Sequence, residues 1–386
     1  MAKKCLIIYP YFAIYREHIF HALSENDFGW EFELVGDSKC DFGIKGIDPK
    51  LAKIPVKEGG FNWTFAKNSL PMGKRIPIHW QQGIISRLLK KDYDAVIMLG
   101  SIYYISYILA LPVLKFMRVP IIFWTHGFLG KDNWFIKECR HIFYKQADAI
   151  LLYGERAKKI MEKSGHYKKK YLDVVYNSLD YRPVENINLS LAQVGDIRKK
   201  LFQSNELPLV VASGRVTKEK NFDYLIDALE LSASRYSKYF NLLIIGEGPE
   251  LENLKCAADE KGVGHLVSFV GSIYGKKAYE YLMASDICVI PGNVGLSAMH
   301  AFSAGIPVIS HNNFNVQMPE FEAIIDGETG SFYEYNNIDD LVTKIHSWVF
   351  NKSRLEGAKK HCLSVIENRY NVNYQMKVFK DCLTQF

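Results

Sequence analysis

The sequence has few cysteines, and they form no pairing pattern. The seven cysteines are scattered along the chain, and none belongs to a Cys-X-X-Cys pair. Disulfide frameworks are typical of secreted proteins, so this arrangement predicts reduced thiols and a cytoplasmic location. The first apolar run, from Cys5 to Tyr9, is also too short for a secretory signal.

Hydrophobic runs long enough to cross a membrane are missing as well. The longest apolar stretch, Ile102–Met117, contains Pro112 and falls short of the roughly 20 residues that a spanning helix needs. We expect either a core helix there or one that lies at a membrane surface. The basic cluster Lys168-Lys169-Lys170 leaves similar alternatives: a solvated loop, or a contact with an anionic membrane surface.

Several familiar catalytic motifs are absent. The chain has no Gly-X-Ser-X-Gly, no Walker A motif and no Gly-X-Gly-X-X-Gly, so serine hydrolases, P-loop NTPases and ordinary dehydrogenases have no basis in the sequence. No His, Cys, Asp and Glu set has the spacing of metal ligands, and Asp92-Tyr93-Asp94 precedes a predicted strand instead of following one. We therefore expect neither a metal nor a cofactor.

A strong excess of one charge is also missing. The net charge of +6 is too small to indicate a nucleic-acid partner, although it fits an anionic ligand.

Apolar residues make up 48% of the 386 residues, which is enough to bury large cores. The length predicts two domains.

What the chain does contain is an alternation of short apolar runs and amphipathic segments. This pattern is typical of parallel sheets covered by helices on both faces. A polar segment with Asn, Ser and Pro, around residues 177–208, separates two such halves. We predict an α/β protein with a first domain over residues 1–185 and a second over residues 186–369.

A basic turn, Ser213–Lys220, follows a predicted strand in the second half. Gly214 permits a close backbone approach, Arg215 offers a forked guanidinium group and Lys220 offers a point charge. Together these features suit a diphosphate. A solvated basic turn is the alternative.

A glycine-rich turn follows a later strand of the same half. Residues 291–296, Pro-Gly-Asn-Val-Gly-Leu, lead into a predicted helix that carries His300. Such turns expose backbone N–H groups to phosphate, although a tight strand-to-helix connection is the alternative. Ligands of open α/β sheets collect at the carboxyl ends of the strands, so both turns are expected to face one ligand.

In the first half, His126 occupies a similar position. It belongs to Trp124-Thr125-His126-Gly127 and again follows a predicted strand. An imidazole there can donate or accept a hydrogen bond in a cleft. A structural histidine with its bonds satisfied in the core is the alternative.

The motifs of the second half closely resemble those of family 4 glycosyltransferases, which have the GT-B fold. The resemblance implies two Rossmann-like domains that face a central cleft, an acceptor domain first and a nucleotide-sugar domain second. It also implies that a final helix, over residues 370–386, crosses back to the first domain. The matching motifs are Gly214-Arg215 with Glu219-Lys220, Ile245-Gly246-Glu247-Gly248-Pro249, Gly295-Leu296, Ala304-Gly305-Ile306-Pro307-Val308 and Asp326-Gly327-Glu328-Thr329-Gly330.

The resemblance further implies an activity. The enzyme would transfer a sugar, with retention and without a metal, from a nucleotide-sugar donor to a saccharide or lipid-linked saccharide, in bacterial surface polysaccharide synthesis. Arg215 and Lys220 would stabilise the departing diphosphate, and His126 would contact the donor. The remaining donor contacts would be Gly214, Asn293, Val294, Gly295 and Leu296.

The chain departs from the family at one point. Two glutamates, eight positions apart, usually flank the Gly-Leu pair, and Gly292 and His300 stand there instead. His300 is expected to bind the nucleotide ribose or the adjacent phosphate, and Glu320 or Glu322 to supply a carboxylate from another loop. Two alternatives stay open: a nucleotide-sugar epimerase of the same fold, and a noncatalytic nucleotide-sugar-binding homologue.

Overall fold

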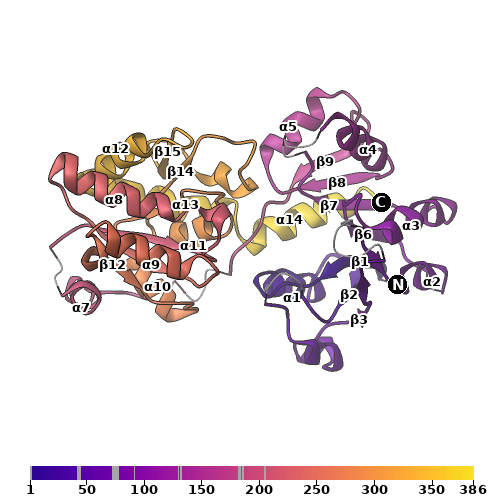
Figure 1. The fold of residues 1–386 in the computed structure, drawn as a ribbon. Helices are drawn as coiled ribbons and strands as arrows, with labels where there is room; N and C mark the ends of the chain where they lie inside the picture. Colours follow the sequence, from indigo (N-terminus) through magenta and orange to yellow (C-terminus); the bar gives the residue numbers. More distant parts are fainter. Residues whose placement is uncertain are drawn as a thin grey trace. The chain divides into compact units, whose positions relative to one another are not determined.

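The computed structural model describes residues 2–40, 45–71, 78–90, 92–128, 130, 133–180, 184, 187–203 and 206–386. The chain folds into two compact units, each an α/β layer structure (Figure 1). The α/β class predicted from the alternating pattern is confirmed. The first unit comprises Met1–Asp180 and Asn371–Phe386, and the second comprises Tyr181–Tyr370.

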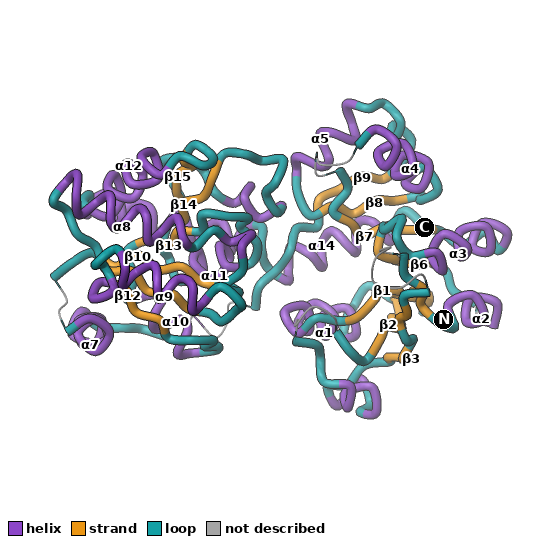
Figure 2. The backbone as a smooth tube through the Cα atoms, viewed as in Figure 1, coloured by secondary structure: helices purple, strands orange, loops and turns teal. Residues whose placement is uncertain are grey.

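A parallel sheet forms the centre of the first unit (Figure 2). Its strand order is β3-β2-β1-β6-β7-β8-β9. The chain therefore adds β2 and β3 on one side of β1 and then returns to add β6 to β9 on the other side. The strands read as continuous apolar runs because both faces are covered. The strands are β1 (Lys3–Tyr11), β2 (Trp30–Asp37), β3 (Trp63–Phe65), β6 (Ala95–Leu99), β7 (Ile121–Thr125), β8 (Ala149–Leu152) and β9 (Tyr171–Val174); β4 (Asn68–Ser69) and β5 (Trp80–Gln81) form a small antiparallel pair.

Two apolar clusters fill the two faces of this sheet. One joins α1 and α14 to the strands through Phe20, Leu23 and Phe379. The other joins α2, α3, α4 and α5 to them. The helices are α1 (Glu17–Ser24), α2 (Ile84–Lys90), α3 (Ile105–Phe116), α4 (Trp134–Tyr144), α5 (Glu155–Lys163) and α14 (Val372–Leu383).

The apolar stretch around Pro112 forms helix α3, which continues through the proline. Pro112 lies on the exposed side of the helix, where water can bond the carbonyl group that lacks a donor. The structure therefore shows an uninterrupted helix where the sequence suggested an interruption. In the described residues, no helix is both long enough and apolar enough to span a bilayer.

The second unit has its own parallel sheet, in the order β12-β11-β10-β13-β14-β15. Two groups of helices form its outer layers, since α8 packs with α9 and α12, and α11 packs with α10 and α13. The strands are β10 (Leu209–Ser213), β11 (Asn241–Ile245), β12 (Val267–Phe269), β13 (Ile287–Val289), β14 (Val308–His311) and β15 (Gly330–Tyr333). The helices are α7 (Leu191–Phe202), α8 (Asp223–Tyr236), α9 (Leu251–Glu260), α10 (Lys276–Met283), α11 (Ser297–Ser303), α12 (Ile338–Val349) and α13 (Lys352–Asn368).

The segment after the second unit belongs to the first. In α14, the side-chain amide of Gln375 donates to the carbonyl oxygen of Tyr176 at 2.9 Å and accepts a hydrogen bond from the hydroxyl of Ser178. The ring of Phe379 lies 5.0 Å from that of Trp124, edge to face. Helix α14 therefore completes the core of a unit whose other residues come from the first half of the sequence.

Candidate active site

The two turns singled out in the second half follow neighbouring strands. Strands β10 and β13 pair with each other, and the chain reaches β11 on one side and β14 on the other. Ligands of doubly wound sheets bind at this kind of switch point, outside the carboxyl ends of the strands. The amide of Gly292 donates to the carbonyl oxygen of Lys220 at 3.0 Å, and the hydroxyl of Ser297 donates to the carbonyl oxygen of Ser213 at 2.7 Å. The structure thus brings the basic turn and the glycine turn together.

Lys220 connects the two turns. It ends a short 3-10 helix, Lys218–Lys220, and its Nζ donates to the carbonyl oxygens of Asn293 at 2.6 Å and Val294 at 3.1 Å. Burial lowers the pKa of Lys220 to about 8, while the negative charge of Glu320 acts in the opposite direction. An ammonium group has three donors, and no described residue accepts from the third. That donor remains for a ligand.

Glycines let the basic turn lie close to its neighbours. Gly214 has a φ of +145°, and a Cβ at this position would lie 3.5 Å from Ser297 Oγ and 3.8 Å from Lys220 Cε. On the other side, Gly246 and Gly248 pack directly on the turn, because a Cβ at either would approach a carbonyl oxygen of Gly214 or Val216 to within about 2 Å. Arg215 is exposed at the surface of this turn.

The glycine turn is held by Gln317, a residue that the sequence analysis did not select. Its side-chain oxygen accepts from the amide of Val294 at 2.8 Å, and its nitrogen donates to Ser310 Oγ at 2.9 Å and to the carbonyl oxygen of His311 at 3.1 Å. Val294, one of the predicted donor contacts, is buried, and its amide is bonded within the protein. The amides of Gly295 and Leu296 bond to no acceptor among the described residues.

The first unusual position, Gly292, has no room for a side chain. A Cβ there would lie 2.0 Å from the carbonyl oxygen of Glu219 and 2.8 Å from the carbonyl carbon of Lys220. The glutamate expected from the family pattern is thus excluded by the backbone of the basic turn. A carboxylate does approach from another element, since Glu320, in the 3-10 helix Pro319–Ala323, is buried and its charge acts on Lys220. Glu322, in the same 3-10 helix, is half-buried.

The second unusual position, His300, lies in α11 and is half-buried. Its Nδ1 shares a hydrogen bond of 2.9 Å with the hydroxyl of Tyr279 on α10. Burial lowers the pKa of His300 to about 4, so the ring is neutral at pH 7. Among the described residues, Nε2 has no hydrogen-bond partner, and it is not enclosed. The ring is fixed from one side and can bond a ligand from the other.

His126 lies in the first unit, directly after β7. The centre of its ring lies 4.5 Å from the centre of the Tyr153 ring, and its Nδ1 is buried without a hydrogen-bond partner among the described residues. Burial lowers the pKa of His126 to about 4, and the positive charges of Arg16 and Arg140 act in the same direction. The neighbouring Arg16 was not selected from the sequence, where its only signal is the aromatic segment Tyr9–Tyr15 that precedes it.

No group of three or more His, Cys, Asp or Glu side chains could hold a metal ion in the part of the chain that the structure describes. Asp94, from the formal Asp-X-Asp pair, accepts a hydrogen bond of 2.7 Å from the amide of Lys4 at the start of β1. That carboxylate lies at the amino ends of the strands of the first unit, whereas His126 lies at their carboxyl ends.

Comparison with known proteins assigns the second unit to a family. The family model for glycosyl transferases group 1 matches residues 193–372. The second unit is a group 1 glycosyltransferase domain. An uncharacterised glycosyltransferase of Methanocaldococcus jannaschii is 26% identical over 196 residues, which are 48% of each chain. A GDP-mannose-dependent α-(1-6)-phosphatidylinositol monomannoside mannosyltransferase of Mycobacterium tuberculosis is 25% identical over 46% of this chain and 48% of its own. The chain therefore matches about half the length of these curated relatives.

Solved structures extend the likeness from the glycosyltransferase domain to the whole chain. The Anabaena protein HepE, in complex with UDP, superposes with a TM-score of 0.73 at 14% identity over 99% of this chain and all of its own. The lipopolysaccharide outer core galactosyltransferase WaaB gives a TM-score of 0.70 at 16% identity, with 99% and 100% covered. The predicted GT-B fold, with two Rossmann-like units, is confirmed.

The position of His300 leads to a prediction for nucleotide binding. We expect His300→Ala to weaken the affinity for the free nucleoside diphosphate by about tenfold, because a hydrogen bond from the open Nε2 is lost. His300→Glu should recover part of this loss if the ribose is the partner, since a carboxylate accepts from hydroxyl groups. Titration calorimetry with both variants measures the effect. Unchanged affinity in both would leave His300 with a packing role only.

Proposed function

We propose that the chain is a retaining, metal-independent glycosyltransferase that uses a nucleotide-sugar donor. The observation that carries this proposal is the convergence of Gly214, Lys220 and the glycine turn at the switch point of a group 1 domain. Fixed cations and backbone donors at that position suit a diphosphate. Arg215, on the same turn, adds a guanidinium group to this set.

In the proposed reaction, the bond between the anomeric carbon and the diphosphate breaks, and negative charge grows on the leaving oxygen. Lys220, Arg215 and the amides of Gly295 and Leu296 stabilise that charge. The acceptor hydroxyl forms its new bond from the face that the diphosphate leaves, which retains the configuration. The acceptor proton passes to the leaving phosphate. No protein nucleophile is needed.

The proposed acceptor is a saccharide or lipid-linked saccharide of a surface polysaccharide or glycolipid. Exposed apolar side chains on α3 and α4, among them Phe116, Trp134 and Phe135, support a peripheral contact with the cytoplasmic face of the inner membrane. The exposed Lys168 and Lys169 add positive charge in the same unit, which favours an anionic lipid surface. Lys170 does not contribute in this way, because its Nζ donates to the carbonyl oxygen of Ala147.

The test is a screen of UDP-, GDP- and other nucleotide sugars, first for thermal stabilisation and then for transfer in the presence of a chelator. A donor at 100 times its dissociation constant should raise the free energy of unfolding by about 2.7 kcal/mol. Transfer with EDTA present, into a product that keeps the anomeric configuration of the donor, supports the whole proposal. Stabilisation without transfer to any saccharide acceptor would identify a binding protein instead. Deuterium uptake at a sugar carbon without an acceptor would identify an epimerase.

The lowered pKa of Lys220 predicts an alkaline limit for this activity. The ammonium form, present below about pH 8, holds the diphosphate and is lost as the pH rises through that value. We expect kcat/KM for the donor, which reports the free enzyme, to fall above pH 8. In Lys220→Arg the side chain stays positively charged, so the alkaline limb of the pH profile, where kcat/KM falls, should move to higher pH even if the maximum rate is lower. A pH profile with the same limb in both proteins would contradict the assignment.

A further inference from the structure

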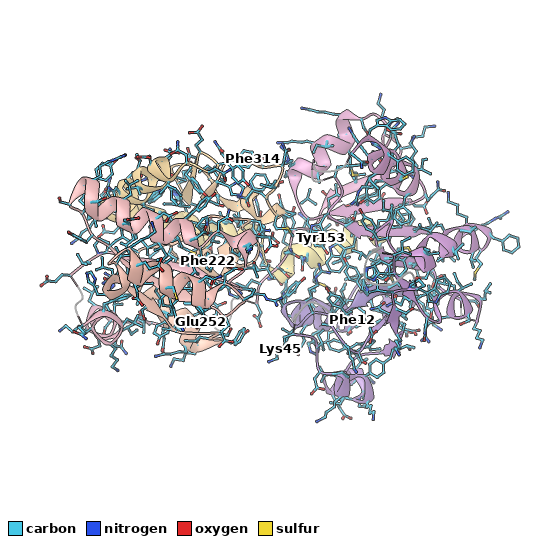
Figure 3. The ribbon with its side chains drawn as sticks, viewed as in Figure 1. Phe12, Lys45, Tyr153, Phe222, Glu252 and Phe314 are labelled. Carbon is cyan, nitrogen blue, oxygen red and sulfur yellow. The ribbon has the colours of Figure 1, made fainter. Side chains whose placement is uncertain are left out.

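The carboxyl ends of β1, β7 and β8 bring together a cation and several aromatic rings in the first unit. The guanidinium carbon of Arg16 lies 4.8 Å from the ring centre of Trp124, 4.9 Å from that of Tyr9, 5.2 Å from that of Tyr153 and 5.5 Å from that of Tyr15. Figure 3 labels Tyr153, which lies at this edge of the first unit. Aromatic faces attract and orient a guanidinium group, so Arg16 is fixed in place.

Tyrosine hydroxyl groups also hold the guanidinium group of Arg16. Nη2 of Arg16 donates to the hydroxyl of Tyr153. The hydroxyls of Tyr153 and Tyr9 lie 2.9 Å apart, and the Tyr9 hydroxyl donates to the carbonyl oxygen of Trp124 at 3.1 Å. Nε of Arg16 is buried without a partner among the described residues, whereas Nη1 is neither enclosed nor bonded to any of them. One arm of the guanidinium is therefore committed, and the other is open.

Arg16 contacts aromatic rings and a tyrosine hydroxyl. No described carboxylate forms an ion pair with it, whereas the half-buried Arg87 and Arg198 each have one. His126 packs on the ring of the same Tyr153; burial lowers its pKa, and the positive charges of Arg16 and Arg140 both lower it further. Its Nε2 is not enclosed and has no partner among the described residues. A half-buried cation without a carboxylate, beside an open imidazole, is an incomplete electrostatic arrangement that an anion would complete.

We propose that Arg16 and His126 form an anion-binding site in the first unit, which takes a phosphate or carboxylate group carried by the acceptor. The open Nη1 of Arg16 supplies a charge-assisted hydrogen bond, and His126 Nε2 supplies a neutral one. The assignment of this anion to the acceptor rests on the proposed glycosyltransferase function. The binding of the anion itself does not, because it depends only on the residues of the first unit.

The experiment uses the full chain with Arg215→Ala and Lys220→Ala, so that the diphosphate site of the second unit no longer contributes. The probes are inorganic phosphate, glucose 6-phosphate, glucuronate and glucose, and the dissociation constants are measured by calorimetry. Phosphate and glucose 6-phosphate should still bind in this background. Arg16→Met should weaken them by about 10- to 100-fold, the range for losing a bond to a charged group. Arg118→Met, which removes an exposed arginine of the same unit, is the matched control and should change nothing.

Each outcome decides one point. Weak phosphate but tight glucuronate binding would assign the site to a carboxylate, and the reverse would assign it to a phosphate. The site is rejected if adding Arg16→Met to the background protein leaves its affinity for the anions unchanged. It is also rejected if the natural protein binds the anions and the background protein does not. If Arg16→Met does not fold, Arg16→Gln keeps a donor for Tyr153 and serves in the same comparison. Anion binding by the background protein, together with no sugar transfer by the natural protein in the donor screen, would leave the site standing and reject the glycosyltransferase proposal.

Discussion

Replacing Lys220 with alanine is expected to lower kcat by about 10²–10³-fold. This is the range found when one hydrogen-bond donor to a developing oxyanion is removed. Two effects add in this variant. The charge that stabilises the leaving diphosphate is lost, and so are the hydrogen bonds to the carbonyl oxygens of Asn293 and Val294 that hold the glycine turn. Arg215→Ala should lower kcat within the same range. It should disturb the protein less, because Arg215 is exposed on its turn.

Lys218 provides the matched control for Lys220. It lies in the same 3-10 helix but is exposed, so Lys218→Ala should retain nearly full activity. The measurement is steady-state kinetics with the donor identified in the screen, together with a thermal melt of each variant. Near-normal turnover in Lys220→Ala and Arg215→Ala would remove the diphosphate from this turn. Equal losses in Lys218→Ala and Lys220→Ala would indicate a general effect of positive charge.

Restoring the family's usual glutamate at position 292 should abolish activity. The Cβ alone would lie 2.0 Å from the carbonyl oxygen of Glu219, so Gly292→Glu must push the basic turn away from the glycine turn. We expect a loss of stability of about 1–3 kcal/mol, as for other overpacked sites. Turnover should fall by at least about 10²-fold, because Lys220 is displaced with the turn.

Gly292→Ala separates the effect of space from that of charge. It should destabilise the protein almost as much as the glutamate, because the first side-chain carbon already causes the clash. The control is Gly357→Ala in α13, where a Cβ meets nothing within 4 Å and alanine favours the helix. Thermal melts and donor kinetics of the three variants provide the comparison. A glutamate variant that is more active than the natural protein would show that the two turns separate during the reaction.

The sequence predicts local chemistry better than contacts between distant segments. Gly214 and Gly295 were selected correctly as turn residues, because a backbone with φ of +145° or +76° strongly favours glycine. The bond between Gln317 and Val294 joins residues 23 positions apart, and that between Tyr279 and His300 joins residues 21 apart. Such bonds depend on how β14, α10 and α11 pack, and no local pattern encodes that packing.

The same limit explains why the bond between Val294 and Gln317 and the surroundings of Arg16 were not predicted. A glycine-rich turn predicts exposed amides, but Gln317 takes the amide of Val294. The aromatic rings around Arg16 come from three separate segments, at the ends of β1, β7 and β8. Each segment by itself resembles an ordinary core strand. Only the strand order of the sheet brings them to one edge.

The attachment of α14 to the first unit also determines the order in which the units can mature on the ribosome. Domains generally fold as they emerge, N-terminal first. Here the first unit cannot complete its folding first. Its core needs Phe379, which packs on Trp124, and Gln375, which bonds to Tyr176, and the ribosome synthesises Gln375 and Phe379 only after the whole second unit. The second unit contains no such late segment. It should therefore reach its native state earlier, while the edge of the first unit that carries Trp124 stays open to chaperones.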